Sequence, residues 1–402
     1  MPSAPSLRTV EQHRRIIAGL ISRTPTVLTP LAAATGLVLA EEVTASIPLP
    51  PFDNSAVDGY AVHTADLATA GADALVRLPV SHLIPAGHPV PKELRAGTVA
   101  RIMTGAPLPV GADAVVPVED ARYDGLQVAF RRPGTLGAHV RRTGEDLMPP
   151  ERLFGAGTVL TPSRIGLLAA SGVGQVLVHR RIRVAVVSTG AEIVDTSAPL
   201  RHGSIHDANS ALLSAAVEDC GAELVACVAV SDSVNRLRAH LEDLGARADV
   251  VITSGGVSTG DHEVVKQTLT PHGVRFTGVS MSPGRPQGAG TAFGTTLLTF
   301  PGNPLAAYAS FEILARPILR RAMGLVPDNR PTVQIPLADP LVRRPGRHTL
   351  DLAAERPDGS LALLTGSGRH GLGAVREARC LVELDGEVPS LDAGATVTAT
   401  VL

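Results

Sequence analysis

The sequence contains few aromatic residues and has no basic surplus. Phe, Tyr and Trp make up 2% of the 402 residues, and Trp is absent. Ala, Val, Leu and Ile must therefore fill the interior, and the aromatic platforms on which proteins stack single-stranded nucleic acid are missing. A formal net charge of -2 also argues against binding a phosphate backbone. We expect no nucleic-acid partner.

Cysteine and long apolar runs are also scarce. The three cysteines show no CxxC spacing, which argues against a disulfide framework and against a structural zinc cluster. The N-terminal segment lacks an apolar signal region, and no window approaches the roughly 18 apolar residues of a membrane span. These absences predict a cytoplasmic protein without a membrane partner.

What is present predicts a multidomain globular protein. A chain of 402 residues corresponds to two to four domains at roughly 100–200 residues each. Residues 10–20 and 31–42 show helical patterns, and Pro48, Pro50 and Pro51 mark a boundary near residue 46.

The regions that follow differ in their periodicity. Short apolar runs separated by Gly and Pro predict strands from 46 to about 145, and residues 163–171 look helical. Strands alternate with helices from 180 to 326, which predicts a mainly parallel sheet with helices on both faces. Short strands return after residue 330, as in a small barrel or sandwich.

The segment ADVVITSGGVSTGDHE, residues 248–263, is the most informative local pattern. Glycines after a parallel strand let the backbone approach an anion, and loop N–H groups bind it. The acids that follow would suit Mg²⁺ held between carboxylate and phosphate oxygens. The alternative is an ordinary turn with an acidic helix start.

Two further loops, residues 186–194 and 298–308, should leave the same sheet at the carboxyl ends of its strands. Ligands bind at those ends in open α/β sheets, so the three loops predict a pocket. Glu192 and Asp232 could add carboxylates to it, although isolated acids more often cap helices or face solvent.

Upstream, residues 51–63 gather Asp53, Asn54, Ser55 and Asp58 in a segment bounded by Pro and Gly. A simple turn would not need so many polar groups. Residues 101–120 and 139–146 add Thr104, two arginines and several acids, for which a solvated surface is the competing interpretation.

At these residues the sequence resembles the molybdopterin molybdenumtransferase family, which includes the bacterial MoeA type and the E domain of gephyrin. The segments that match, in the family's order, are PFDNSAVDGYAV, RIMTGAPLP, GADAVVPVE, RRTGED, VVSTGAEIV, ITSGGVSTGDHE and FPGNP. They span nearly the whole chain.

The resemblance implies four domains and a homodimer whose pocket is shared between subunits. The domains are an elongated scaffold (1–45 and 146–179), a small β-rich domain (46–145), a molybdopterin-binding α/β domain of the MogA type (180–326) and a C-terminal β-barrel (327–402). The implied reaction inserts molybdenum from molybdate into adenylyl-molybdopterin and releases AMP. Charge neutralisation by Mg²⁺, backbone N–H groups and arginines suits such a reaction.

The family's functional residues carry over by position. The implied catalytic residues are Asp58, Thr104, Asp146, Glu192, Asp232 and Asp261, with Glu192 and Asp261 as metal ligands. The implied substrate-binding residues are Ser188, Thr189, Gly190, Ser254, Gly255, Gly256, Ser258, Gly260, Pro283, Gly284, Arg285, Pro301, Gly302, Asn303, Arg347 and Ser367.

One segment departs from the family pattern. Where the family commonly has Lys-Pro-Gly-Lys-Pro, this chain has Ser282, Pro283, Gly284, Arg285 and Pro286. The first lysine is lost and the second is an arginine, which keeps the charge but presents a planar, forked donor. Molybdate would bind more weakly here, or other residues would complete its site.

Three other functions stay open at this point. A molybdopterin adenylyltransferase resembles only the α/β portion, and so does a nucleotide hydrolase of the competence-damage-inducible type. A gephyrin-like scaffold would bind a receptor peptide without forming AMP.

Overall fold

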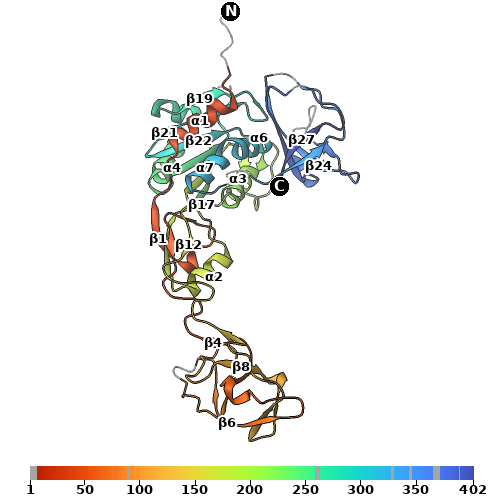
Figure 1. Cartoon of the computed structure of the whole chain (residues 1–402). Helices are drawn as coiled ribbons and strands as arrows, with labels where there is room; N and C mark the ends of the chain where they lie inside the picture. Colours follow the sequence, from red (N-terminus) through yellow and green to blue (C-terminus); the bar gives the residue numbers. More distant parts are fainter. Residues whose placement is uncertain are drawn as a thin grey trace, which may run out of the picture. The chain divides into compact units, whose positions relative to one another are not determined.

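The computed structural model describes residues 7–87, 91–258, 263–326, 330–343, 346–364, 372–388 and 390–402 (Figure 1). Contacts along the chain separate two compact units. Unit 1 comprises Met1–Val27, Gly36–Ala40 and Leu177–Leu402, and unit 2 comprises Leu28–Thr35 and Glu41–Val176. The finer division into four domains stays a prediction. No helix among the described residues has the length and apolar character needed to cross a membrane.

Unit 1 is built around a mixed six-stranded sheet with the order β17-β14-β18-β22-β21-β19. The first four strands are mutually parallel, and β21 and β19 add antiparallel pairs at one edge. The strands are β14 (Arg183–Thr189), β17 (Glu223–Val230), β18 (Val250–Ser254), β19 (Arg275–Gly278), β21 (Pro286–Ala292) and β22 (Thr295–Phe300).

Helices cover both faces of this sheet. Helix α4 packs on β17 and β18 beside α5, while α3 packs on β14 and β17 beside α6. Nearly every residue of β14 and β18 is buried, as expected of strands covered on both sides. The helical elements are α1 (Val10–Leu20), α3 (Ala208–Asp219), α4 (Val234–Arg247), α5 (Val264–Leu269), η4 (Thr270–His272), α6 (Pro304–Ser310), η5 (Phe311–Ala315) and α7 (Arg316–Ala322).

The C-terminal part of unit 1 forms a second sheet, with the order β20-β24-β26-β27-β23 and with β25 paired to β24. A single parallel bridge joins Leu337, just after β23, to Leu361 of β25, but the described residues form no longer ladder there, so the predicted barrel stays a prediction. Its elements are β20 (Met281–Ser282), β23 (Thr332–Pro336), β24 (His348–Glu355), β25 (Leu361–Leu363), η6 (Leu372–Arg376), β26 (Cys380–Leu384) and β27 (Thr396–Val401). Two short strands, β15 (Ile193–Val194) and β16 (Ile205–His206), pair beside the first sheet.

Unit 2 is rich in β structure, as predicted. Its main sheet has the order β8-β5-β7-β6-β10-β9, and the rings of Tyr60 and Phe130 meet edge to face in its core. Its elements are η1 (Leu31–Ala33), β3 (Val43–Thr44), β4 (Asn54–Ser55), β5 (Gly59–Val62), η2 (Thr64–Leu67), β6 (Val76–Ile84), β7 (Val99–Ile102), β8 (Ala114–Pro117), η3 (Val118–Asp120), β9 (Ala121–Tyr123), β10 (Gln127–Phe130), β11 (Val140–Arg141), β12 (Arg152–Phe154) and α2 (Pro162–Ala170).

The predicted helix over residues 31–42 is wrong. Only the single turn η1 forms, and β2 (Val38–Leu39) follows it. Gly36 adopts a left-handed conformation with φ of 77°, which interrupts a right-handed helix. β2 is then fully buried and pairs with β13 (Gln175–His179), so tertiary burial outweighs the helical propensity of the alanines. Strand β1 (Thr26–Pro30) carries the chain from unit 1 into unit 2.

Candidate functional site

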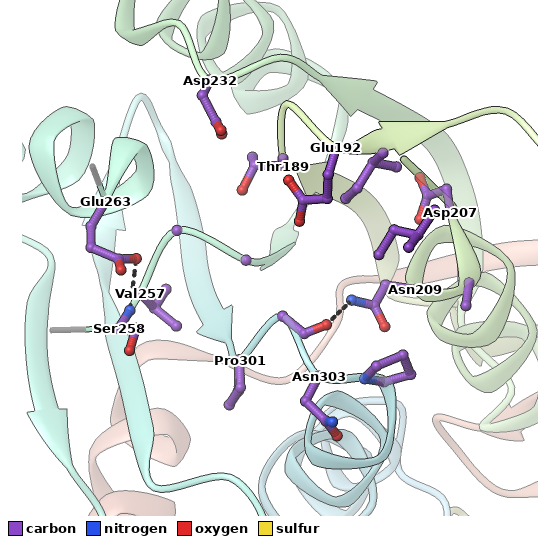
Figure 2. Close-up of a pocket in the computed structure, with 18 of the residues that line it drawn as sticks. Thr189, Glu192, Asp207, Asn209, Asp232, Val257, Ser258, Glu263, Pro301 and Asn303 are labelled. Atoms are coloured by element: carbon purple, nitrogen blue, oxygen red, sulfur yellow. Dashed lines mark hydrogen bonds between the residues drawn. The ribbon is translucent and has the colours of Figure 1, made fainter. Parts of the chain in front are cut away.

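A pocket of about 470 Å³ opens at the carboxyl ends of the parallel strands of unit 1 (Figure 2). This volume lies within the range of small-molecule sites. The three loops that the sequence predicted to meet do line it. Predicted residues in the lining are Thr189, Gly190, Glu192, Asp232, Gly255, Gly256, Ser258, Pro301, Gly302 and Asn303.

Gly255 brings the three loops into direct contact. Its N–H donates to the carbonyl of Phe300 over 3.1 Å, and its φ is 95°. A Cβ at this position would lie 2.4 Å from the carbonyl oxygen of Thr189. Only glycine fits, so the close approach of three strand ends depends on the absence of a side chain.

A network of buried hydrogen bonds joins the same loops. Asn209, which is 5% exposed, donates from Nδ2 to Ser254 Oγ (2.7 Å) and to the carbonyl of Gly302 (2.8 Å). Ser254 Oγ in turn donates to the carbonyl of Pro301. The Oδ1 atom of Asn209 has no hydrogen-bond partner among the described residues.

Sequence reasoning missed Asn209, because its partners lie 45 and 93 residues away. The sequence signal that could have drawn attention to Asn209 is the segment HDANS, in which Asp207 stands directly before the first residue of a helical run. Asp207 caps α3 by accepting from Ser210 N and Ser210 Oγ, and it also lines the pocket.

Among the described residues, four carboxylates line the pocket, whereas no lysine or arginine does. Besides Asp207, Asp232 accepts from Ala191 N over 3.0 Å, and Glu263 accepts from Ser258 N over 2.7 Å. The carboxylate of Glu192 has no hydrogen-bond or ionic partner in the parts of the chain that the structure describes, whereas its backbone carbonyl accepts from Ile205 N. Figure 2 shows Glu192 and Asp232 on one side of the pocket, with Pro301 and Asn303 on the other.

Of the two predicted metal ligands, the structure describes Glu192 alone. Asp261 lies outside the described residues, as do Gly260 and Ser367. Within the described ranges, no three Asp, Glu, His or Cys side chains converge as a metal cluster. Ser188, another predicted binding residue, is 1% exposed and is not part of the lining.

The segment of residues 282–286 lies beside the strand that follows Arg347. Strand β20 pairs in parallel with the start of β24, with Met281 opposite His348 and Ser282 opposite Thr349. Pro286 reaches the pocket lining. The side chains of Arg285 and Arg347 are exposed, and neither has a partner among the described residues.

In unit 2, the structure joins two of the predicted catalytic residues. Asp58 Oδ1 accepts from both the N–H and the Oγ1 of Thr104, each over 2.7 Å. These bonds, with the backbone N–H contributing most, lower the pKa of Asp58 below its usual value. Asp146 is exposed, and its N–H donates to the carbonyl of Leu49.

Asp53 makes the same arrangement as Asp58. Its Oδ1 accepts from the N–H and Oγ1 of Thr143, and Arg142 adds an ion pair of 2.7 Å to Oδ2. The backbone bond from Thr143 is the main cause that lowers the pKa of Asp53. A carboxylate bonded in this way caps a turn.

Comparisons with known proteins bear on both units. Residues 8–172 match the family model described as "MoeA N-terminal region (domain I and II)", and residues 185–321 match "Probable molybdopterin binding domain". Molybdopterin molybdenumtransferase 2 of Mycobacterium tuberculosis is 44% identical, over 81% of this chain and 82% of the relative. Molybdopterin molybdenumtransferase 1 of that organism is 35% identical, over 92% and 93%.

A solved structure agrees. This chain is 29% identical to a molybdopterin biosynthesis MoeA protein from Pyrococcus horikoshii, with a TM-score of 0.80 over 98% of this chain and 99% of that one. Fold and pocket define a multidomain α/β protein with a pocket at the strand ends. The chain belongs to the molybdopterin molybdenumtransferase family, whose members are transferases of molybdenum cofactor biosynthesis. The predicted family and enzyme class are confirmed.

Proposed function

We propose that this chain inserts molybdenum from molybdate into adenylyl-molybdopterin and releases AMP. The pocket of unit 1 carries the proposal, because glycine-rich loops at the carboxyl ends of parallel strands line it beside four carboxylates. Glycines there would let a phosphate-bearing substrate approach the backbone closely. The carboxylates would repel it unless a cation lay between them.

Mg²⁺ fits the donor set of this pocket. The available donors are carboxylate and backbone oxygens, and Mg²⁺ commonly uses one or two carboxylates together with substrate phosphates. Glu192 is the carboxylate left without a partner, so it would hold the ion, with Asp261 as the second ligand that the family resemblance implies. Bound Mg²⁺ would neutralise charge on the phosphoanhydride. Asp232 and Glu263 would keep the adjoining loops in place.

The molybdate site would use Arg285 and Arg347. Both guanidinium groups are exposed and unpaired in the described residues, and the β20–β24 pairing brings their segments together. Arginine binds oxyanions through paired N–H donors, so this pair would replace the missing lysines.

The decisive experiment measures AMP. Purified protein is incubated with adenylyl-molybdopterin and Mg²⁺, with and without molybdate. We expect AMP release that depends on molybdate and falls strongly in Glu192→Ala. Equal AMP release without molybdate would instead indicate a nucleotide hydrolase. Consumption of ATP with free molybdopterin would indicate an adenylyltransferase, and peptide binding without AMP formation would indicate a scaffold.

We further propose a homodimer in which unit 2 of one subunit completes the pocket of the other, as the family resemblance implies. Asp58→Ala and Glu192→Ala should each be inactive. In heterodimers of the two variants, closed two-fold symmetry allows one intact pocket, so activity should return to about half per dimer. Heterodimers that form yet stay inactive would refute the shared pocket.

A further inference from the structure

In the part of the chain that the structure describes, the guanidinium group of Arg343 donates its hydrogen bonds to uncharged oxygen atoms, while the charges of Asp351 and Asp385 attract it without an ion pair. Nη1 donates to the carbonyls of Asp385 (2.7 Å) and Val388 (2.8 Å). Nη2 donates to the carbonyls of Arg347 and Leu384 (3.0 Å each) and to Thr349 Oγ1 (3.2 Å). No carboxylate pairs with it among the described residues. An arginine used in this way ties backbone segments together.

It ties the end of β26 and the residues that follow it to the start of β24 and to the backbone of Arg347, which directly precedes β24. Other bonds fix the same stretch. Ser280 Oγ donates to the carbonyl of Gly346, His348 N donates to the carbonyl of Ser280, and Gly346 N donates to the carbonyl of Gly386. The main chain on both sides of Arg347 is therefore held in one place, while its side chain is exposed and unpaired.

A fixed backbone with a free guanidinium is what a preorganised anion site requires. Binding energy is lost when a charged side chain must first be ordered, and a rigid attachment reduces that loss. The parallel pairing of β20 with β24 extends the same rigidity to the segment that leads to Arg285.

We infer that Arg343 is a positioning residue, which holds Arg347 in register with the segment of Arg285 so that both arginines bind one tetrahedral oxyanion. This inference rests on the proposed function. It adds a positioning role for Arg343, which acts on the anion through Arg347 and does not contact it.

The test compares the KM for molybdate with the KM for adenylyl-molybdopterin in Arg343→Met, in full-length protein with Mg²⁺. Met preserves much of the apolar stem but donates no hydrogen bonds. A misplacement of about 1 Å in a substrate-positioning group can cost up to about a hundredfold in catalytic rate. We expect the KM for molybdate to rise about tenfold or more, with the KM for adenylyl-molybdopterin within about twofold of wild type.

Three further variants make the result interpretable. Arg356→Met is the matched control, because Arg356 lies in the same sheet region and makes only an exposed ion pair with Asp339; it should leave both constants unchanged. Arg343→Lys should recover part of the molybdate affinity, since a lysine can still donate to some of the carbonyls. Ser280→Ala removes a separate tie to the same stretch and should raise the KM for molybdate by a few-fold, even if Arg343→Met does not fold.

The outcomes separate two failures. If Arg347→Ala leaves the KM for molybdate unchanged, the proposed oxyanion site is wrong, and so is this inference. If Arg347→Ala raises it but Arg343→Met and Ser280→Ala do not, or raise both constants equally, only the positioning role of Arg343 is overturned.

Discussion

The buried amide of Asn209 offers a sharp test of how the pocket is held together. Asn209→Leu preserves the approximate shape of the side chain but removes two hydrogen bonds, to Ser254 Oγ and to the Gly302 carbonyl. Each bond contributes about 1 kcal/mol, and the buried Ser254 Oγ left without its donor costs roughly a further 1–3 kcal/mol. Removal of the unpartnered Oδ1 offsets part of this loss. The net cost should be about 2–3 kcal/mol.

The assay is thermal unfolding followed by kinetics. At about 2–4 °C per kcal/mol for a unit of this size, the midpoint of unit 1 should fall by about 5–10 °C. The KM for adenylyl-molybdopterin should also rise, because the glycine loops lose their common anchor. Asn235→Leu is the matched control. Asn235 is the second residue of α4, as Asn209 is of α3, but it is exposed, so its replacement should change stability by less than about 0.5 kcal/mol. Equal midpoints for the two variants would refute the reasoning.

Two further predictions follow from charged groups. Asp58→Asn keeps an oxygen that can accept from Thr104 but removes the negative charge. Because the proposed reaction uses that charge, AMP release should fall by roughly a hundredfold or more while the midpoint of thermal unfolding stays unchanged. Asp53→Asn is the matched control and should retain activity. Burial, assisted by the charge of Arg8, lowers the pKa of His13 from 6.5 to about 4. The unfolded chain therefore binds the proton first, and stability is lost as pH falls from 6.5 towards 4. The loss between pH 7 and pH 5 should be about 2 kcal/mol greater in wild type than in His13→Leu, measured by thermal unfolding. Identical pH profiles for the two proteins would contradict the assignment.

The parts of the pocket that the sequence predicted correctly are local. Loops that follow parallel strands and are rich in Gly, Ser and Thr can be recognised from short stretches of sequence. The geometry of a parallel sheet then brings these loops together at one edge. The family's motifs also name Asp58 and Thr104, which the structure joins across 46 residues, and their catalytic role stays a prediction.

What the sequence could not supply depends on partners far along the chain. Asn209 sits in an ordinary helix start, and only the positions of Ser254 and Gly302 give its amide a role. In the sequence, Arg343 resembles any surface arginine. Its role depends on the carbonyls of Val388 and Leu384, which lie 45 and 41 residues further along the chain and accept its hydrogen bonds. The false helix at 31–42 has the same origin, because burial of β2 against β13 decided its conformation.

The position of α1 has a consequence for the order of synthesis. Its residues are made first, yet it packs on η5 and β21, and Arg14 donates from Nε to the carbonyl of Ile313, which is 299 residues away. At about 5–20 residues per second, translation of that distance takes roughly 15–60 seconds. Unit 2 has been synthesised well before then, whereas α1 has no partner to pack against until β21 and η5 have been made. The face of α1 that is buried in the folded protein, including Val10 and Ile17, is therefore an apolar surface that the nascent chain exposes until η5 has been made.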